Sequence, residues 1–339
     1  MKRNEINISY LKELFVKYYG ESYHEIRVFT SPGRVNLIGE HIDYCGGSVF
    51  PAALTLSCAA AVRLNDSNVV NLRAEDLDGV YSFDLRNTLS GKSLKWGNYQ
   101  AGVIHGLMEK GYHVRGMDLL FIGNIPFGSG LSSSAAIELT TAVAAATLSE
   151  NFTEKGIDLV QMALIGQTAE HTFCNVHCGI MDQFASAMGK KDHAILLDCA
   201  SLKYKYVPLD LGNYMLVLAN TCKKHALGAS AYNKRREEVA EGLLRMNHAL
   251  DENRVNLCDF NETDYWRAEA KLGSDKVKDR IKHVIFENER VKKAVSILEN
   301  GDLKSFGKIL CEAHESIRDL YEVTGPELDA MFEIASHTD

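Results

Sequence analysis

The feature that most narrows the fold of this chain is an apolar run that leads directly into a glycine-rich turn and then a helix. Residues 117–122 have the composition of a buried strand, and residues 131–149 have helical spacing. The glycines at 128 and 130 allow backbone N–H groups to approach a ligand closely, and the positive end of the helix points at the same place. The sequence therefore predicts a phosphate-binding loop over residues 128–134.

A simpler explanation of this loop is an ordinary serine-capped helix after a loose turn. Three consecutive serines, Ser132 to Ser134, favour the ligand-binding interpretation, because capping needs only one hydroxyl. The chain has no Gly-x-x-x-x-Gly-Lys-Ser/Thr motif and neither the His-Arg-Asp nor the Asp-Phe-Gly motif of protein kinases. If the loop binds phosphate, it is therefore of a different kind from the P-loop and from the glycine-rich loop of protein kinases.

A second informative segment is a cluster of polar residues between two strand-like runs, and it includes a tight Gly46-Gly47 turn. Carboxylate oxygens accept hydrogen bonds from hydroxyls while an arginine only donates, so such a mixture suits a polyol. A structural ion pair or a turn cap would explain any one of these residues. Five of them within ten positions predict a sugar site: Arg34, Asn36, Glu40, His41 and Asp43.

A third segment carries two acids, Glu170 and Asp182, in an apolar and helix-compatible context. Asp182 follows Gly179 and opens an apolar run over residues 184–188, where a neighbouring cation could tune a desolvated carboxylate. The structural alternative is a buried aspartate that caps a helix.

Together these segments resemble the galactokinases of the GHMP small-molecule kinase superfamily. Residues 33–44 followed by Gly46-Gly47 are similar to the sugar signature of that family, although threonine is commoner at position 42 and asparagine at position 45. Residues 126–135 resemble its Pro-x-Gly-x-Gly-Leu-Ser-Ser-Ser-Ala motif, and Cys178 to Gln183 resemble the segment that carries the catalytic aspartate.

The resemblance implies roles for individual residues. The catalytic pair would be Asp182 and the facing Arg34. Sugar contacts would come from Arg34, Glu40, His41, Asp43, Gly179, Asp182 and, in a similar segment over residues 225–236, Tyr232. The ATP phosphates would be wrapped by Gly128, Ser129, Gly130, Leu131, Ser132 and Ser133, and Mg²⁺ would be held by Ser134 and Glu170. Trp96 and Tyr99, in a Trp-x-Asn-Tyr motif, would lie near the nucleotide base.

The order of expected elements predicts an α+β fold with two domains, residues 1–190 and 191–339. The first would contain strands over 59–63, 69–73 and 117–122 and helices over 98–110, 131–149 and 156–172. The second would open with strands over 194–197, 204–207 and 215–219. The resemblance implies a split β-α-β second domain, with ATP and sugar in the cleft between the two.

The third glycine-rich motif of the family, of the type Met-Thr-Gly-Gly-Gly-Phe-Gly-Gly, does not follow residues 326–329 in this sequence. We therefore expect an incomplete second domain, either because the sequence is a fragment or because a natural form has lost part of its second sheet.

A formal net charge of −8 argues against nucleic acid or an anionic membrane as the main partner. No stretch approaches the roughly 20 apolar residues of a membrane span, and we expect a cytoplasmic monomer. Eight scattered cysteines fit reduced thiols better than a disulfide framework. Four possible metal ligands cluster together, but their spacing matches no pair of zinc knuckles: His171, Cys174, His177 and Cys178.

The expected reaction is transfer of the ATP γ-phosphate to the anomeric hydroxyl of galactose, giving α-galactose 1-phosphate. One alternative is a 1-kinase for N-acetylgalactosamine or another sugar, which Cys45 favours and Gly47 disfavours, since a bulkier residue is expected at position 47 in that branch. A second alternative is a non-catalytic galactose sensor. Such sensors have an altered serine-alanine loop, whereas Ser132 to Ala136 are intact here.

Overall fold

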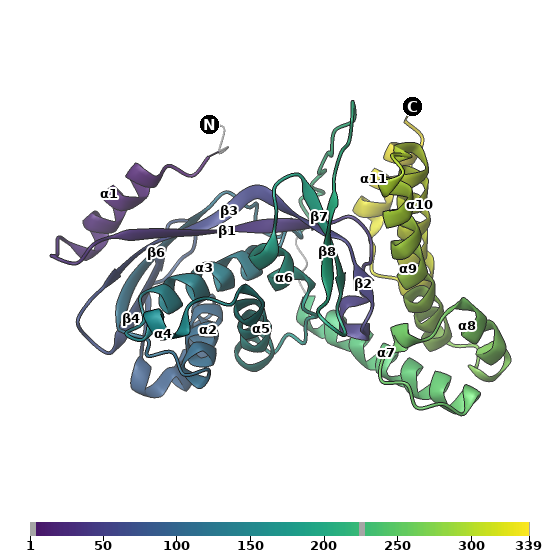
Figure 1. The fold of residues 1–339 in the computed structure, drawn as a ribbon, viewed down its shortest axis with the longest axis horizontal. Helices are drawn as coiled ribbons and strands as arrows, with labels where there is room; N and C mark the ends of the chain where they lie inside the picture. Colours follow the sequence, from purple (N-terminus) through teal and green to yellow (C-terminus); the bar gives the residue numbers. More distant parts are fainter. Residues whose placement is uncertain (1–4, 224–227, 339) are drawn as a thin grey trace. The chain divides into compact units, whose positions relative to one another are not determined.

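The computed structural model describes residues 5–223 and 228–338 and divides the chain into two compact units (Figure 1). The first unit comprises residues 1–34 and 53–189, and the second comprises residues 35–52 and 190–339. The sequence analysis placed residues 35–52 in the first domain. They group with the second because Ser48 and Val49 pair with Asp198 and Leu197 in a strand ladder of that unit.

The first unit is built on a five-stranded sheet of order β1-β3-β6-β4-β5. The strands are β1 (Arg27–Asn36), β3 (Pro51–Leu64), β4 (Val69–Ala74), β5 (Tyr81–Asp84) and β6 (Met117–Gly123). Strand β6 runs antiparallel to β3, with Cys58 opposite Gly123, and parallel to β4. The glycine-rich turn therefore leaves the sheet at the end of a central strand.

Alternate residues of β3 face opposite sides of this sheet, as strand geometry requires. Ala59 and Ala61 join a core cluster with helix α1 (Ile8–Tyr19), whereas Ala60 and Val62 join the larger cluster formed with the remaining helices. Figure 1 shows α1 on one side of the sheet and the other helices on the opposite side. These helices are α2 (Gly97–Glu109), α3 (Ser133–Thr147), α4 (Phe152–Lys155), α5 (Leu159–Ala169) and α6 (Met181–Met188).

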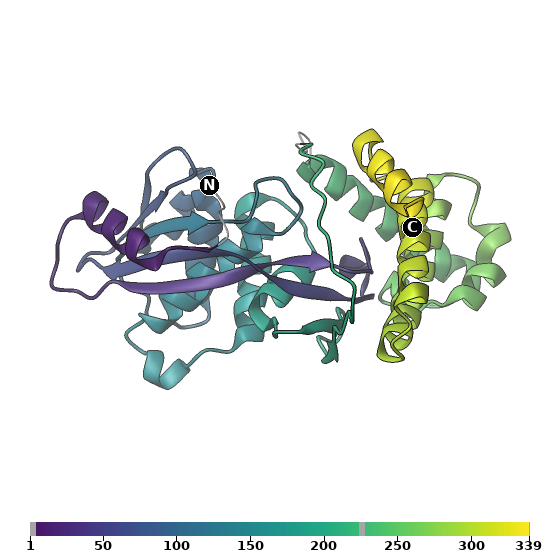
Figure 2. The ribbon, with the colours of Figure 1, turned by 90° about the horizontal axis from the view of Figure 1, so that it is seen from above.

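The second unit has a three-stranded antiparallel sheet formed by β2 (Ser48–Val49), β7 (His193–Asp198) and β8 (Tyr204–Pro208). Its helices are α7 (Gly228–Leu250), α8 (Glu262–Ala268), α9 (Lys276–Glu299), α10 (Leu303–Ser316) and α11 (Pro326–Ser336). Helices α9 and α10 pack side by side (Figure 2).

Short 3₁₀ and π segments complete both units: η1 (Asp43–Cys45), η2 (Leu85–Ser93), η3 (Glu170–Cys174), η4 (Leu257–Asp259), η5 (Glu269–Lys271) and η6 (Ile317–Tyr321).

The expected strand over residues 215–219 is not formed. This segment has no ladder partner within the described residues, and its apolar side chains, including Met215 and Val217, are exposed. A strand needs a neighbour for its backbone groups, and apolar composition alone does not supply one. The expected helices of the first unit, by contrast, agree with α2, α3 and α5 to within three residues at each end. No helix in the described ranges is long and apolar enough to cross a membrane.

Candidate active site

Asp182 and Arg34 form a close ion pair in the first unit. Oδ1 of Asp182 lies 2.8 Å from Nε and 2.6 Å from Nη2 of Arg34. Its other oxygen, Oδ2, accepts a hydrogen bond of 2.5 Å from the Ser132 hydroxyl. The N-cap of α6 is Ile180, so Asp182 lies within the first helical turn and its side chain is not the cap. The capping explanation of this residue therefore does not hold.

The glycine-rich loop is attached to this pair. Nη1 of Arg34 donates to the carbonyl of Gly130 at 2.6 Å. Gly128 and Gly130 have φ values of 69° and 72°, which favour glycine. Ser132 precedes α3 in the left-handed conformation, and no side-chain hydrogen bond caps the helix. Because its hydroxyl donates to Asp182, the first amides of α3 keep their capacity to bind an anion.

Two cavities of the first unit meet at this loop. One, of about 230 Å³, is lined by residues 128–134 together with Arg34, Asp182 and Pro126. The other, of about 380 Å³, is mainly apolar, is lined by Trp96 among others, and shares Pro126 and Ser133 with the first. The cavities thus connect the Asp182 pair, the serine-rich loop and an aromatic wall.

Tyr99 does not line either of these cavities and instead lies near Glu170, whose negative charge adds to the effect of burial in raising the pKa of the tyrosine. Of the two aromatic residues expected near the base, only Trp96 borders the larger cavity.

A buried carboxyl pair lies behind the serine loop. Burial and the charge of Glu170 hold the pKa of Glu138 well above its ordinary value, and burial raises the pKa of Glu170 itself. Ser134 lies close enough to Glu170 to favour the charged form of its carboxyl and so to lower its pKa against the effect of burial, and Gln183 Nε2 donates to Glu138 at 3.0 Å. The adjacent hydroxyl and carboxylate of Ser134 and Glu170 are oxygen donors of the type that Mg²⁺ prefers. The sequence analysis did not single out Glu138, although an acid among the small residues of α3 could have drawn attention to it.

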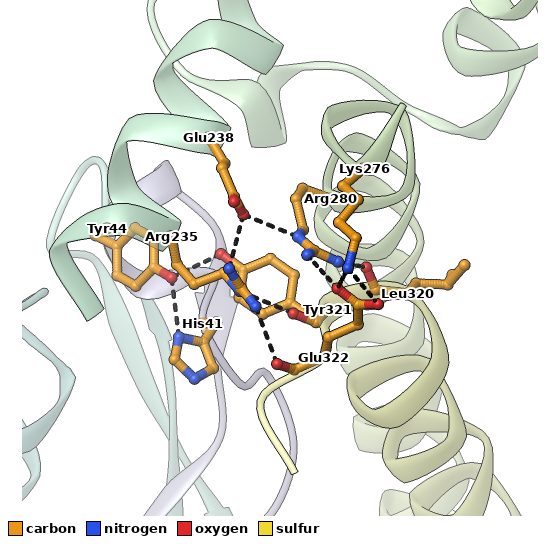
Figure 3. A network of polar contacts seen from close by, with 9 residues as sticks. All are labelled: His41, Tyr44, Arg235, Glu238, Lys276, Arg280, Leu320, Tyr321 and Glu322. Carbon is orange, nitrogen blue, oxygen red and sulfur yellow. Dashed lines mark hydrogen bonds and ion pairs between the residues drawn. The ribbon is translucent and has the colours of Figure 1, made fainter. Parts of the chain in front are cut away.

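The second unit holds the other polar residues of the sugar signature (Figure 3). His41 has a φ of 62°, and its Nδ1 lies 2.9 Å from the Tyr44 hydroxyl, which lies 2.7 Å from the Tyr321 hydroxyl. The ring of Tyr232, on α7, lies 5.7 Å from the His41 ring and 5.3 Å from the Tyr44 ring, measured between centroids. The structure therefore brings His41 and Tyr232 together. Residues 225–227 of the segment that carries Tyr232 lie outside the described residues.

Helix α9 holds the backbone of the signature through three buried side chains. His283 Nε2 lies 3.1 Å from the carbonyl of Glu40, and its Nδ1 lies 2.9 Å from the Ser316 hydroxyl. Glu287 accepts from the amide of Gly39 at 3.0 Å, and Asn288 accepts from the amide of Ser48 at 2.9 Å. The sequence analysis missed these residues. The sequence signal that could have identified them is the presence of polar side chains among the apolar residues on one face of α9.

The predicted site residues thus fall into two groups. Arg34, Gly179, Asp182, Glu170, Trp96 and the serine loop belong to the first unit, and Glu40, His41, Asp43 and Tyr232 belong to the second. Within the cluster of possible zinc ligands, His171 Nε2 lies 2.8 Å from the carbonyl of Cys178. All eight cysteines are free thiols.

The fold and the phosphate loop define a class of protein. Residues 98–190 match the N-terminal domain of the GHMP kinases. The structure of a mevalonate kinase from Methanococcus jannaschii, 18% identical, has the same fold with a TM-score of 0.60, covering 93% of this chain and 85% of that one. The fold is therefore the α+β fold of the GHMP kinases, as predicted.

Closer relatives narrow the class to a family. Residues 13–64 match the galactokinase galactose-binding signature. A galactokinase of Clostridium tetani is 48% identical over 97% of this chain and 82% of its own length, and one of Bacillus subtilis is 40% identical over 95% and 81%. The crystal structure of Lactococcus lactis galactokinase complexed with galactose superimposes with a TM-score of 0.92 at 38% identity, covering 98% of this chain and 84% of that one. This chain belongs to the galactokinase family.

Proposed function

We propose that this chain phosphorylates galactose at its anomeric hydroxyl with ATP, and that Asp182 and Arg34 carry the reaction. The observation that supports this assignment is the position of the pair. Asp182 is bound by Arg34 and Ser132 on the wall of the cavity that the serine loop lines. A carboxylate beside a phosphate loop can act on the hydroxyl that attacks the γ-phosphate.

In the proposed mechanism, Asp182 accepts a hydrogen bond from the anomeric hydroxyl and either takes its proton or orients its oxygen toward the γ-phosphate. Arg34 offsets the negative charge that develops on the transferred group. Its three contacts, two to Asp182 and one to Gly130, fix the guanidinium in place before substrate binds. Loose phosphoryl-transfer transition states depend mainly on such alignment and charge stabilisation.

ATP would lie across the two joined cavities. The phosphates would contact the amides and hydroxyls of the loop that opens α3, where the helix dipole favours negative charge. The base would enter the larger cavity beside Trp96. Gln100 lies four residues after Trp96, on the same face of α2, and lines that cavity. It is fully buried, and neither atom of its amide has a hydrogen-bond partner in the part of the chain that the structure describes. An amide offers one donor and one acceptor, which matches the neighbouring acceptor and donor on an edge of adenine.

Ser134 and Glu170 would hold Mg²⁺, which would supply positive charge to offset that of the phosphates when bound. The two side chains lie close together, since Ser134 favours the charged form of Glu170 and so lowers the pKa of its carboxyl against the effect of burial. Two protein oxygens suffice for a cation that usually keeps several waters and takes further ligands from the nucleotide.

Glu40, His41, Asp43, Gly179 and Tyr232 would select the sugar. The N-acetylgalactosamine alternative expects a bulkier residue than Gly47. A Cβ at position 47 would lie 2.8 Å from Sγ of Cys258 and 2.9 Å from Cδ1 of Ile42, so the packing favours glycine and the galactose assignment. A monomeric state and a cytoplasmic location stay predictions.

The test is a sugar panel with ATP in which ADP release is followed. We expect galactose to support turnover and glucose to be rejected by several kcal/mol, because hydroxyl-reading sites are left with unpaired groups when a hydroxyl is misplaced. Asp182→Asn serves as the inactive control. Equal turnover of glucose and galactose, or preference for the N-acetyl sugar, would contradict the assignment.

A further inference from the structure

The sugar signature contacts a buried tyrosine that is 280 positions away in sequence from His41. Tyr321 ends the π segment η6 and is fully buried. Its hydroxyl meets that of Tyr44, which in turn meets Nδ1 of His41 (Figure 3). The proposed mechanism gives His41 a role in sugar selection but gives none to Tyr44 or Tyr321.

The protons of this chain can be ordered in two ways. If Tyr321 donates to Tyr44 and Tyr44 donates to Nδ1 of His41, every hydroxyl proton has an acceptor. In the reverse order, His41 donates from Nδ1 to Tyr44 and Tyr44 donates to Tyr321, whose own proton then has no acceptor among the described residues. A buried donor without an acceptor is costly, so the first order is favoured.

The first order requires a neutral histidine with its proton on Nε2. Burial, and then the charges of His283 and Arg235, lower the pKa of His41 to about 3, so the ring is neutral at pH 7. A neutral imidazole that accepts at Nδ1 must donate at Nε2. Within the described residues Nε2 of His41 has no hydrogen-bond partner, and Figure 3 shows it on the side of the ring away from Tyr44.

The tyrosine is itself held by two arginines. Arg235 donates from Nε to the Tyr321 carbonyl at 2.9 Å and from Nη2 to the Glu322 carbonyl at 3.0 Å. Arg280 donates to the carbonyl of Leu320 and pairs with Glu322. Arg235 is one of three consecutive cationic residues on α7, and its side chain is largely buried against this segment. Both the backbone and the ring of Tyr321 are therefore fixed.

We propose that Tyr321 and Tyr44 are positioning residues that hold His41 in the tautomer with its proton on Nε2, so that His41 donates a hydrogen bond to a hydroxyl oxygen of the sugar. The part of this inference that concerns the sugar rests on the proposed function. The tautomer itself is a property of the free protein. It can therefore be tested whether or not galactose is the substrate.

The first experiment is ¹⁵N NMR of histidine-labelled full-length protein without sugar, with the His41 signals assigned from a His41→Gln variant. We expect a protonated Nε2 and an unprotonated, hydrogen-bonded Nδ1 at pH 7. In Tyr44→Phe the Nδ1 resonance should move toward the value of a nitrogen without a donor. In Tyr321→Phe the resonance should change less, because Tyr44 can still donate to Nδ1 but its hydroxyl is no longer held by a partner. A proton on Nδ1 in the wild type, or an unchanged Nδ1 resonance in Tyr44→Phe, would overturn the proposal.

The second experiment measures galactose kinetics of the same variants. Tyr44→Phe should raise KM for galactose roughly three- to tenfold, the worth of one neutral hydrogen bond, with little change in kcat. Tyr321→Phe should raise KM by a smaller factor, because Tyr44 can still donate to Nδ1 of His41. Tyr265→Phe is the matched control, because Tyr265 is a buried tyrosine of the same unit that packs on Trp266 and Phe286. It should change neither KM nor the His41 spectrum. If Tyr44→Phe and Tyr321→Phe both fold and both leave KM for galactose unchanged, the positioning role is refuted. A wild-type enzyme with the expected tautomer but no galactose turnover would instead refute the proposed substrate.

Discussion

The two groups of predicted site residues, one in each unit, are built in opposite ways. In the first unit, Asp182, Arg34 and Ser132 form a charged cluster that is partly open to solvent, and all three come from short sequence motifs. In the second unit, His41, Tyr44 and Tyr321 form a neutral and largely buried chain whose last member comes from a distant helix end. Charge suits a group that must act on a phosphoryl transfer, whereas neutral hydrogen bonds suit a group that must discriminate between hydroxyls.

In the second unit, a buried arginine and its carboxylate partners lie next to the backbone that carries Tyr321. Arg280 is 1% exposed and binds Glu238 and Glu322 at 2.9 and 2.7 Å. In that position the ion pairs stabilise the segment around Tyr321, because Arg280 also donates to the carbonyl of Leu320. The comparison therefore predicts that loss of a charge affects chemistry in the first unit and stability in the second.

The largest expected effect is on chemistry. Asp182→Asn should lower turnover roughly 10²- to 10⁴-fold, the usual worth of a positioned acid-base group, while galactose binding survives in calorimetry. Asp192→Asn, at an exposed position with a φ of 59° that asparagine tolerates, is the control with the same chemical change. Turnover of Asp182→Asn close to that of the control would show that the carboxylate of Asp182 is structural.

The next effect is on stability. Arg280→Met should lower the free energy of unfolding by about 3 kcal/mol, because it removes the charged hydrogen bonds that the buried guanidinium donates to Glu238, Glu322 and the Leu320 carbonyl. Lys276→Met removes an ion pair to the same Glu322 at 2.7 Å, but Lys276 is 67% exposed, so it should cost less than about 1 kcal/mol. Urea titrations of both variants measure the difference. Equal losses would show that burial of Arg280 adds nothing.

The same comparison explains how far the sequence could predict this molecule. Arg34 and Asp182 lie in local motifs with clear chemistry, and the structure pairs them as the family resemblance implied. The hydrogen bond from Ser132 to Asp182 was not predicted. Tyr321 and His283 could not be found in this way, because their partners at Tyr44 and Glu40 are about 240 or more positions away and no local pattern encodes that contact. Only the tertiary structure shows that Tyr321 and His283 contact the sugar signature.

The fold shows the same division. Helices α2, α3 and α5 follow from their own periodicity, and their bounds were predictable. The expected strand over residues 215–219 has suitable composition but depends on a pairing partner, which local sequence does not specify. For residues 35–52, membership of the second unit depends on ladder contacts with β7 and hydrogen bonds from α9. Such non-local contacts cannot be read from hydrophobic patterning.

A smaller effect is expected in the pH dependence of stability, which should differ between the two units. Burial lowers the pKa of His283 from 6.5 to about 3, so the folded protein keeps it neutral while the unfolded chain takes up a proton below pH 6.5. Its contribution to stability is complete above pH 6.5 and falls by about 1.4 kcal/mol for each pH unit as the pH drops toward 3. The raised pKa values of Glu138 and Glu170 act in the opposite direction, since their contribution grows as the pH falls toward 4.5.

Hydrogen exchange at pH 7 and pH 5.5, corrected for intrinsic rates, should therefore show protection lost in the second unit and maintained in the first. In His283→Gln this loss should be smaller, because the amide can still donate to the Glu40 carbonyl but takes up no proton. An equal loss of protection in both units would contradict the contrast between a buried histidine and a buried carboxyl pair.

The smallest expected effect separates binding from stability within the first unit. Gln100 contributes two buried polar atoms without partners, and such groups typically cost about 1–3 kcal/mol. Gln100→Leu should therefore raise the melting temperature of the free protein, yet raise KM for ATP by up to about tenfold, because the base loses a hydrogen-bonding partner. Gln161→Leu, on α5 and outside both cavities, should leave KM for ATP unchanged. A stabilised Gln100→Leu enzyme with normal KM for ATP would show that the amide does not read the base. The opposite signs expected for stability and affinity are the signature of a polar group retained for its ligand, because a purely structural glutamine would lose stability when replaced.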